Sequence, residues 1–155
     1  MSDEAGQDAI AVEASAVRLL AAREHSRHEL RHKLLQRFGD DAPVDDVLDD
    51  LEQRCLLSDE RFAGAYVAQR VRKGYGPLRI RAELEQRGIA ADLSARYLDD
   101  GEHDWSEVLA ATAAHKFGDT VVTDRRVLAS RGRFLEQRGY PVGMIRRYLD
   151  SVRGF

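Results

Sequence analysis

The stretch KGYGPLRIRAELEQRGI, residues Lys73–Ile89, contains signals for both ends of one helix. Gly76 can serve as the N-cap, and Pro77 then falls at the first helical position, where a missing backbone N–H costs nothing. At the other end, Gly88 occupies the position at which many helices finish in a left-handed residue. The stretch therefore predicts a short helix of about three turns whose ends are both specified locally.

Apolar residues flank both of these end signals. Tyr75 precedes the cap and Ile80 is the fourth helical residue, which is the spacing of a hydrophobic staple. Ile89 follows the C-terminal glycine, and we expect it to pack against Leu84 as in a Schellman motif. The helix is thus predicted to turn one face inward and to leave its arginines on the other.

The C-terminal signal recurs along the chain. LEQRGI at residues 84–89 matches LEQRGY at residues 135–140, and more loosely LLQRFG at residues 34–39, so that the leading leucines are spaced by 50 and 51 residues. A second landmark, a Leu-Asp pair, has the same spacing and begins at Leu48, Leu98 and Leu149. Two landmarks in one register predict a repeat of about 50 residues that occurs three times.

Helical periodicity within each repeat predicts three helices, and no segment alternates apolar and polar residues for long enough to form a sheet. Val121 and Val122 are predicted to belong to a packed loop. We therefore expect an all-α protein of three tandem three-helix repeats in an elongated array. A flexible acidic N-terminal tail is placed at residues 1–10, and the repeats are placed at residues 11–57, 58–101 and 102–155.

Composition narrows the class of protein. The chain has 155 residues, of which 43% are hydrophobic and 33% charged, and a single cysteine, Cys55. One cysteine cannot form a disulfide framework, so a reducing cytoplasm is the expected compartment. No apolar run is long enough to span a membrane, and the acidic N-terminus lacks the basic region of a secretory signal. We expect a cytoplasmic monomer that does not bind membranes.

The net charge of −3 conceals a segregation of signs along the chain. From Arg61 to Arg81 there are six basic residues and no acid, whereas from Asp40 to Glu52 there are seven acids and no base. Such separation is typical of a protein that meets a patterned surface in one orientation.

Taken together, these residues resemble the RecX family, the bacterial modulators of the RecA recombinase. Lys73–Ile89 is similar to the most recognisable motif of that family, and two further features support it: the opening Asp59–Phe62 of the middle repeat and the Gln-Arg-Gly endings at Gly88 and Gly139. The resemblance extends from about Ala11 to the C-terminus. Repeat one departs from the pattern, because Phe38 stands where the other repeats have glycine.

The resemblance implies a curved rod of three helical repeats that docks in the groove of RecA filaments on single-stranded DNA. It also implies inhibition of the recombinase's ATP hydrolysis, strand exchange and coprotease activity, through blocked filament growth or through disassembly. A rod of stacked helices offers a long contact surface, and its charges can set the register of binding.

Candidate partner-binding residues come from the basic stretch and its tyrosine. They are Arg70, Arg72, Lys73, Tyr75, Arg79, Arg81 and Arg87. We expect the cations to meet acidic residues of the filament or phosphates of DNA. The alternative is that they are solvated faces of amphipathic helices, and the predicted staple is an alternative role for Tyr75.

The same residues also bear on other classes of function. A helical DNA-binding module that acts mainly through phosphate contacts is the main rival, and its binding would not need the recombinase. His28 and His32 have the spacing of a metal-binding pair, but no second cluster completes a site with them or with His25, so no metal or cofactor is expected. No nucleophile–base pair is visible, and the Asp-Asp pairs lie in solvated, charge-rich surroundings, so no enzyme is expected. A purely structural scaffold would leave the charge segregation unused.

Overall fold

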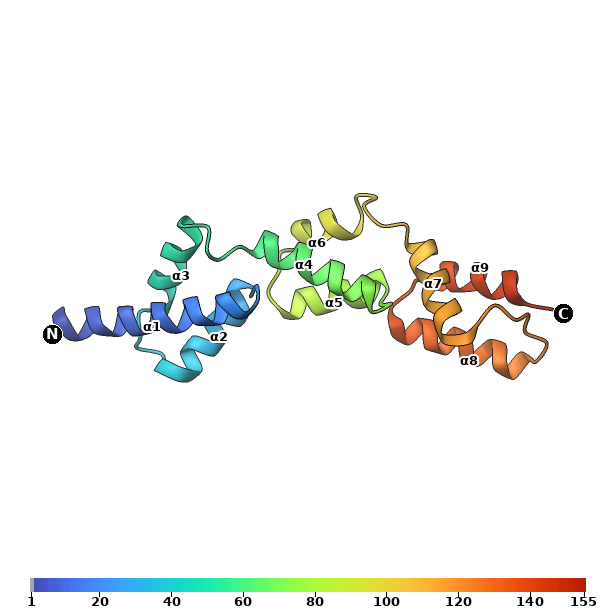
Figure 1. Ribbon diagram of the computed structural model, residues 1–155, viewed down its shortest axis with the longest axis horizontal. Coiled ribbons are helices and arrows are strands. Elements are labelled where there is room, and N and C mark those ends of the chain that lie inside the picture. The colour runs from blue at the N-terminus through green and yellow to red at the C-terminus, as the bar shows by residue number, and fades with distance from the viewer. Residues whose placement is uncertain (1) are drawn as a thin grey trace. The chain divides into compact units, whose positions relative to one another are not determined.

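The computed structural model describes residues 2–155, and within them the chain forms nine helices and no strand (Figure 1). The helices are α1 (Ser2–Ala22), α2 (Arg27–Phe38), α3 (Val44–Gln53), α4 (Asp59–Arg72), α5 (Pro77–Gln86), α6 (Ala91–Leu98), α7 (Trp105–Phe117), α8 (Arg125–Arg138) and α9 (Val142–Val152). This confirms the all-α prediction. The predicted repeat boundaries fall between α3 and α4 and between α6 and α7, and the boundaries themselves stay a prediction.

The pair Val121–Val122 lies in a loop, as expected. Val122 is buried and forms an isolated parallel bridge with Arg153. Its N–H donates to the carbonyl of Val152 over 2.8 Å, and its own carbonyl accepts from the N–H of Gly154 over 2.9 Å. These two bonds attach the C-terminal residues to the loop between α7 and α8.

Helix starts follow the capping signals in the sequence. The Ser26 hydroxyl accepts the N–H of Glu29 over 3.1 Å at the start of α2, and Asp104 caps α7 by accepting from the N–H groups of Ser106 and Glu107. Ser26 and Glu29 have the spacing of a capping box, but only the Ser26 half of it forms, because the carboxylate of Glu29 forms ion pairs with Arg23 over 3.0 Å and with Arg87 over 3.2 Å. Ion pairing, including that with the distant Arg87, therefore uses the carboxylate that the local motif would use.

At the N-terminus, α1 begins at Ser2, so residues 2–10 are helical where the sequence suggested a flexible acidic tail. Asp3 and Glu4 lie in the first turn, where a helix favours acidic side chains, and Ala5 is a strong helix former. Ile10 is 69% exposed, so this end of the helix is held by little packing. Its flexibility in solution stays a prediction.

The chain divides into two compact units, and the division runs through α4, α5 and α6. The first unit comprises residues up to Ala65 together with Glu85–Leu93. Its core joins α1, α2 and α3, and the fully or nearly fully buried residues are Val12, Ala16, Leu30, Leu34, Val44, Val47, Leu48, Leu51 and Leu57. The apolar residues that had predicted three helices in the first 57 residues thus meet in one cluster.

His25 is buried at the joint between α1 and α2. Its Nδ1 lies 3.1 Å from the carbonyl oxygen of Arg23, and its Nε2 lies 2.9 Å from Nζ of Lys33. Because a carbonyl can only accept, Nδ1 carries the proton, and Nε2 then accepts from the ammonium group. Burial, assisted by the nearby Arg23 and Lys33 charges, lowers the pKa of His25. The histidine is a buried structural link between α1 and α2.

The second unit comprises Tyr66–Leu84 and Ser94–Phe155. One core cluster joins α7, α8 and α9 through Leu109, Leu135, Tyr140 and Ile145, with Phe134 and Tyr148 among the partly buried neighbours. Tyr140 is the largest fully buried side chain of the described chain. Its hydroxyl donates to the carbonyl of Gly74 over 2.8 Å, which ties the end of α8 to the turn before α5.

Candidate partner-binding site

The helix predicted from Lys73–Ile89 is present as α5, and it begins at Pro77 as expected. The N–H of Ile80 donates to the carbonyl of Gly76 over 3.2 Å, so Gly76 is the residue that caps the helix. At the other end Gly88 has a φ of +75°, and Ile89 and Leu84 are both buried. Both local end signals are therefore confirmed.

The start of α5 contacts the end of α8 through backbone atoms. The N–H of Gly76 donates to the carbonyl of Arg138 over 2.7 Å, and the N–H of Leu78 donates to that of Gly139 over 2.9 Å. Each bond pairs a free donor at one helix start with a free acceptor at another helix end. A Cβ on Gly76 would lie 2.6 Å from the carbonyl atoms of Gly139, so only glycine allows this approach.

A similar approach occurs in the first unit. A Cβ on Gly88 would lie 2.5 Å from Cβ of His28 near the start of α2, and Arg87 pairs with Glu29 over 3.2 Å. In both units, the glycine that ends a helix packs against the start of the middle helix of the preceding predicted repeat. The first repeat has no such contact: a Cβ added to Gly39 would have no described atom within 4 Å apart from those of its chain neighbours. No helix approaches closely there, which accounts for the divergent ending at Phe38.

The ring of Tyr75 lies among three guanidinium groups. Their central carbons are 3.7 Å (Arg70), 4.4 Å (Arg79) and 4.5 Å (Arg138) from the ring centroid. Such cation–π contacts contribute about 0.5–1 kcal/mol each at exposed sites and more when desolvated. The sequence predicted a staple between Tyr75 and Ile80 and did not predict these neighbours.

Glu83 joins two of the same arginines from α5. Its Oε1 accepts from Arg70 over 2.7 Å and from Arg79 over 3.2 Å, and its other oxygen accepts from the Tyr66 hydroxyl. Burial opposes the charged carboxylate, but the hydrogen bonds from Tyr66 and Arg70 outweigh it and lower the pKa of Glu83. Arg70 and Arg79 therefore both form ion pairs within the chain, beside Tyr75. Arg79 also donates a hydrogen bond to the Gln137 carbonyl over 3.1 Å.

The remaining predicted residues divide into paired and unpaired cations. Arg81 forms an ion pair with Asp99 over 2.5 Å, and Arg87 belongs to the other unit, where it pairs with Glu29. Arg72 and Lys73 are exposed at the end of α4, and within residues 2–155 neither side chain enters an ion pair or hydrogen bond. These two cations are the part of the predicted site that is available to a partner.

The acidic stretch between Asp40 and Glu52 is also partly neutralised. Its ion pairs are Arg27 with Asp45, Asp49 and Glu52, Arg31 with Asp45, and Arg54 with Asp50. Charge segregation along the sequence therefore overstates the segregation on the folded surface.

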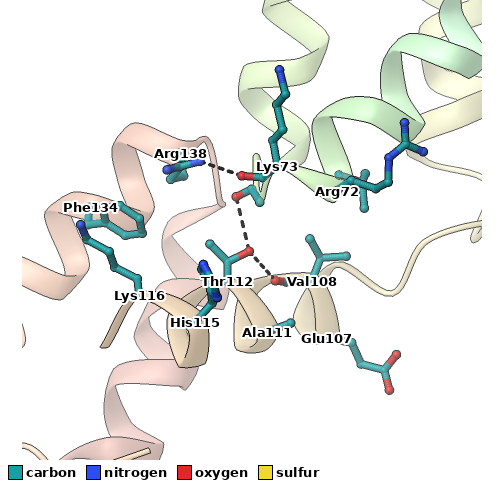
Figure 2. Close-up of a pocket in the computed structure, with 12 residues that line it drawn as sticks. Arg72, Lys73, Glu107, Val108, Ala111, Thr112, His115, Lys116, Phe134 and Arg138 are labelled. Carbon is teal, nitrogen blue, oxygen red and sulfur yellow. Dashed lines mark hydrogen bonds between the residues drawn. The ribbon is translucent and has the colours of Figure 1, made fainter. Parts of the chain in front are cut away.

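Beside Arg72 and Lys73 the structure contains a pocket of about 420 Å³, shown in Figure 2, which the sequence did not predict. The end of α4, the outer face of α7 and one side of α8 line it, and its apolar wall includes Val71, Val108, Ala111 and Phe134. Four cations lie around it, and the sole acid among the lining residues is Glu107. Its parts lie far apart in sequence, so no local pattern could have revealed it.

No helix among the described residues is both long and apolar enough to cross a membrane. In the same residues, no group of three or more His, Cys, Asp or Glu side chains is arranged to hold a metal ion.

Comparison with known families gives two matches in tandem. The first three-helix domain of RecX matches residues 14–51, and the second three-helix domain of RecX matches residues 58–98. Curated relatives match over most of their own length. The regulatory protein RecX of Ectopseudomonas mendocina (strain ymp) is 45% identical over 90% of this chain and 93% of its own. That of Halorhodospira halophila is 42% identical over 92% of this chain and 89% of its own.

Two crystal structures share the fold. The structure of RecX from Lactobacillus salivarius has a TM-score of 0.76 and 16% identity, and it covers 95% of this chain and 97% of its own. A second structure, of a regulatory protein RecX, has a TM-score of 0.74 and 20% identity over 95% of this chain and 74% of its own.

Proposed function

The chain belongs to the RecX family of regulatory proteins, and we propose that it binds RecA filaments on single-stranded DNA and inhibits the recombinase. Inhibition would extend to ATP hydrolysis, strand exchange and coprotease activity, through blocked filament growth or promoted disassembly. On this proposal the chain is a cytoplasmic, monomeric regulator of homologous recombination, DNA repair and the SOS response rather than an enzyme. The observation that carries the proposal is the 45% identity to a RecX protein over 90% of the chain.

We propose further that three tandem repeats, at residues 11–57, 58–101 and 102–155, form an elongated, curved array that lies in the filament groove. Arg72 and Lys73 would make charged contacts to the filament or its DNA, since both are exposed and unpaired in the described chain. Arg81 and Arg87 would contribute at the cost of exchanging their present partners. Arg70, Tyr75 and Arg79 would act by holding α4, α5 and α8 in place.

To test this, one measures the rate at which the cognate recombinase hydrolyses ATP on single-stranded DNA while this protein is added in substoichiometric amounts. We expect wild-type protein to slow hydrolysis and the double variant Arg72→Glu/Lys73→Glu to require at least tenfold more protein for the same effect. Neither side chain has a partner to lose among residues 2–155, so the helical content should not change. A recombinase that ignores the wild-type protein would overturn the proposal, and full inhibition by the double variant would remove these two residues from the contact.

Direct DNA binding is the second candidate function, and the charge of the C-terminal third favours it. Residues 105–155 contain nine Lys or Arg and five Asp or Glu, and no ion pair of the described chain involves any of them. If DNA is the principal ligand, the chain binds it without the recombinase. The logarithm of the binding constant then falls by roughly 0.7–0.9 per phosphate contact for each tenfold increase in salt concentration. Arg146→Glu/Arg147→Glu on α9 should then weaken DNA binding more than Arg72→Glu/Lys73→Glu does.

A further inference from the structure

We propose that the pocket bounded by α4, α7 and α8 receives an apolar side chain from an acidic segment of the partner protein. This inference rests on the proposed function and adds to it the chemistry of one contact. The pocket has the volume of a ligand site, since such sites fall between roughly 300 and 1,000 Å³ and this one is about 420 Å³. It therefore has room for one large side chain and the backbone beside it.

The walls of the pocket are aliphatic where an anchor would lie. Val71, Val108 and Ala111 line it with no charged group among them, and Gly74 contributes backbone only. The one hydroxyl among the lining residues, that of Thr112, is already bonded: it donates to the Val108 carbonyl over 2.8 Å and lies 3.1 Å from the Tyr140 hydroxyl. An apolar side chain can be buried here without leaving a polar group unsatisfied.

The charge around the pocket selects the neighbours of that anchor. Arg72 and Lys73 extend outward at one side, and Lys116 and Arg138 lie beside Phe134 at the other (Figure 2). No carboxylate of the described residues forms an ion pair with any of these four. Carboxylates on both sides of an apolar anchor would meet cations at each rim, and such complementarity sets orientation and association rate.

A nucleotide fits the pocket less well than a peptide does. Stacking of a base needs an open aromatic face, and Phe134 already contacts Lys116 at 5.5 Å, Arg138 at 5.0 Å and Phe117 edge-on at 5.2 Å. A base would also bring polar edge groups against aliphatic walls, where each unpaired group costs about 1–3 kcal/mol. The cations alone would suit phosphates, but the walls between them favour an aliphatic side chain.

Filling the pocket tests this directly. Ala111 is exposed and lines the pocket, whereas Ala110 is exposed on the same helix and does not line it. Ala111→Trp should therefore block the site, and Ala110→Trp is the matched control, with thermal unfolding of both variants confirming an intact fold. The probe is a fluorescein-labelled peptide with one leucine between two runs of three acidic residues, followed by fluorescence anisotropy with the full chain.

We expect Ala111→Trp to weaken peptide binding at least tenfold and Ala110→Trp to change it less than twofold. Replacing the peptide's leucine by serine should weaken binding to a similar extent as Ala111→Trp. Glu107→Gln removes the one acid of the lining and should tighten binding about two- to fivefold, which a nonspecific steric effect would not do. Failure of the wild-type protein to bind the peptide, or equal binding by Ala111→Trp, overturns the inference.

Two further arms separate this inference from its rivals and from the proposed function. If a labelled 15-nucleotide oligothymidylate displaces the peptide and loses affinity equally in Ala111→Trp, the pocket is a nucleic-acid site and the inference is wrong. In the recombinase assay, inhibition by wild type but equally by Ala111→Trp overturns the inference and leaves the proposed function standing. Peptide binding without any inhibition by wild type overturns the proposed function instead.

Discussion

Replacing Gly76 by alanine tests whether the backbone contact between α5 and α8 stabilises the second unit. The new Cβ would lie 2.6 Å from the carbonyl carbon and oxygen of Gly139 and 2.7 Å from the nitrogen of Tyr140. Ordinary contact begins at 3.4 Å, so the two backbones must separate by close to 1 Å. These are backbone atoms and cannot rotate away as the end of a long side chain can.

That separation would lengthen the bonds from Gly76 to Arg138 and from Leu78 to Gly139, now 2.7 and 2.9 Å, beyond hydrogen-bonding distance. Each bond contributes about 0.5–1.5 kcal/mol, and a buried carbonyl left without a partner costs about 1–3 kcal/mol. We therefore expect the free energy of unfolding to fall by roughly 2–4 kcal/mol. For a chain of this size the corresponding loss in Tm is roughly 4–15 °C.

The assay is urea unfolding followed by circular dichroism, with Gly143→Ala as the matched control. Gly143 lies in α9, has no positive φ and has no atom within 4 Å of a built Cβ. The same substitution there should stabilise the protein by about 0.5–1 kcal/mol, because alanine loses less backbone freedom on folding. Equal stability of Gly76→Ala and wild type would refute the reasoning, as would a similar loss in both variants.

Three further perturbations test local parts of the structure. Ser26→Ala removes the N-cap of α2 and should lower the free energy of unfolding by about 1 kcal/mol, measured by urea unfolding, with the exposed Ser130→Ala unaffected. Glu83→Gln should lower the free energy of unfolding by about 1.5–3 kcal/mol at pH 7. Because folding lowers the pKa of Glu83, the carboxylate's contribution to stability is complete above about pH 4.3 and is lost as the pH falls below that value. A difference between variant and wild type that is the same at pH 3 as at pH 7 would contradict this account. The lowered pKa of His25 means that the unfolded chain binds its proton first, so stability should fall as the pH drops below about 6.5, by at most about 1.4 kcal/mol per pH unit, and His25→Gln should remove that slope.

Helix ends were the part of the fold that local sequence specified best. Pro77 starts α5, and Gly88 follows the end of α5 in a left-handed conformation. Ser26 and Asp104 cap their helices, as their residue types predict. Each of these features depends on groups within a few residues of one another, so it does not depend on how distant helices pack.

Partner choice among the charged residues was not predictable in this way. Glu29 has the spacing of a capping-box residue, yet its carboxylate binds Arg23 and Arg87. For Tyr75 the sequence predicted only the nearby Ile80 as a partner, whereas its ring also contacts Arg138 of a distant helix. The basic stretch from Arg61 to Arg81 contains six cations, but ion pairs with Glu24, Glu83 and Asp99 leave Arg72 and Lys73 as its exposed, unpaired members among the described residues. Which acid meets which base depends on helices separated by tens of residues.

The sequence by itself determined the helical class, the register of about 50 residues and the family resemblance, because periodicity, caps and glycine endings are all written in local spacing. Tertiary structure added a second reason for glycine at Gly76, Gly88 and Gly139, since each also permits a close approach by a distant helix. It also decided where the pocket lies, because Val71, Ala111 and Phe134 become neighbours only when α4, α7 and α8 pack together. Backbone and side-chain contacts of that range depend on packing geometry, which no local window of sequence contains.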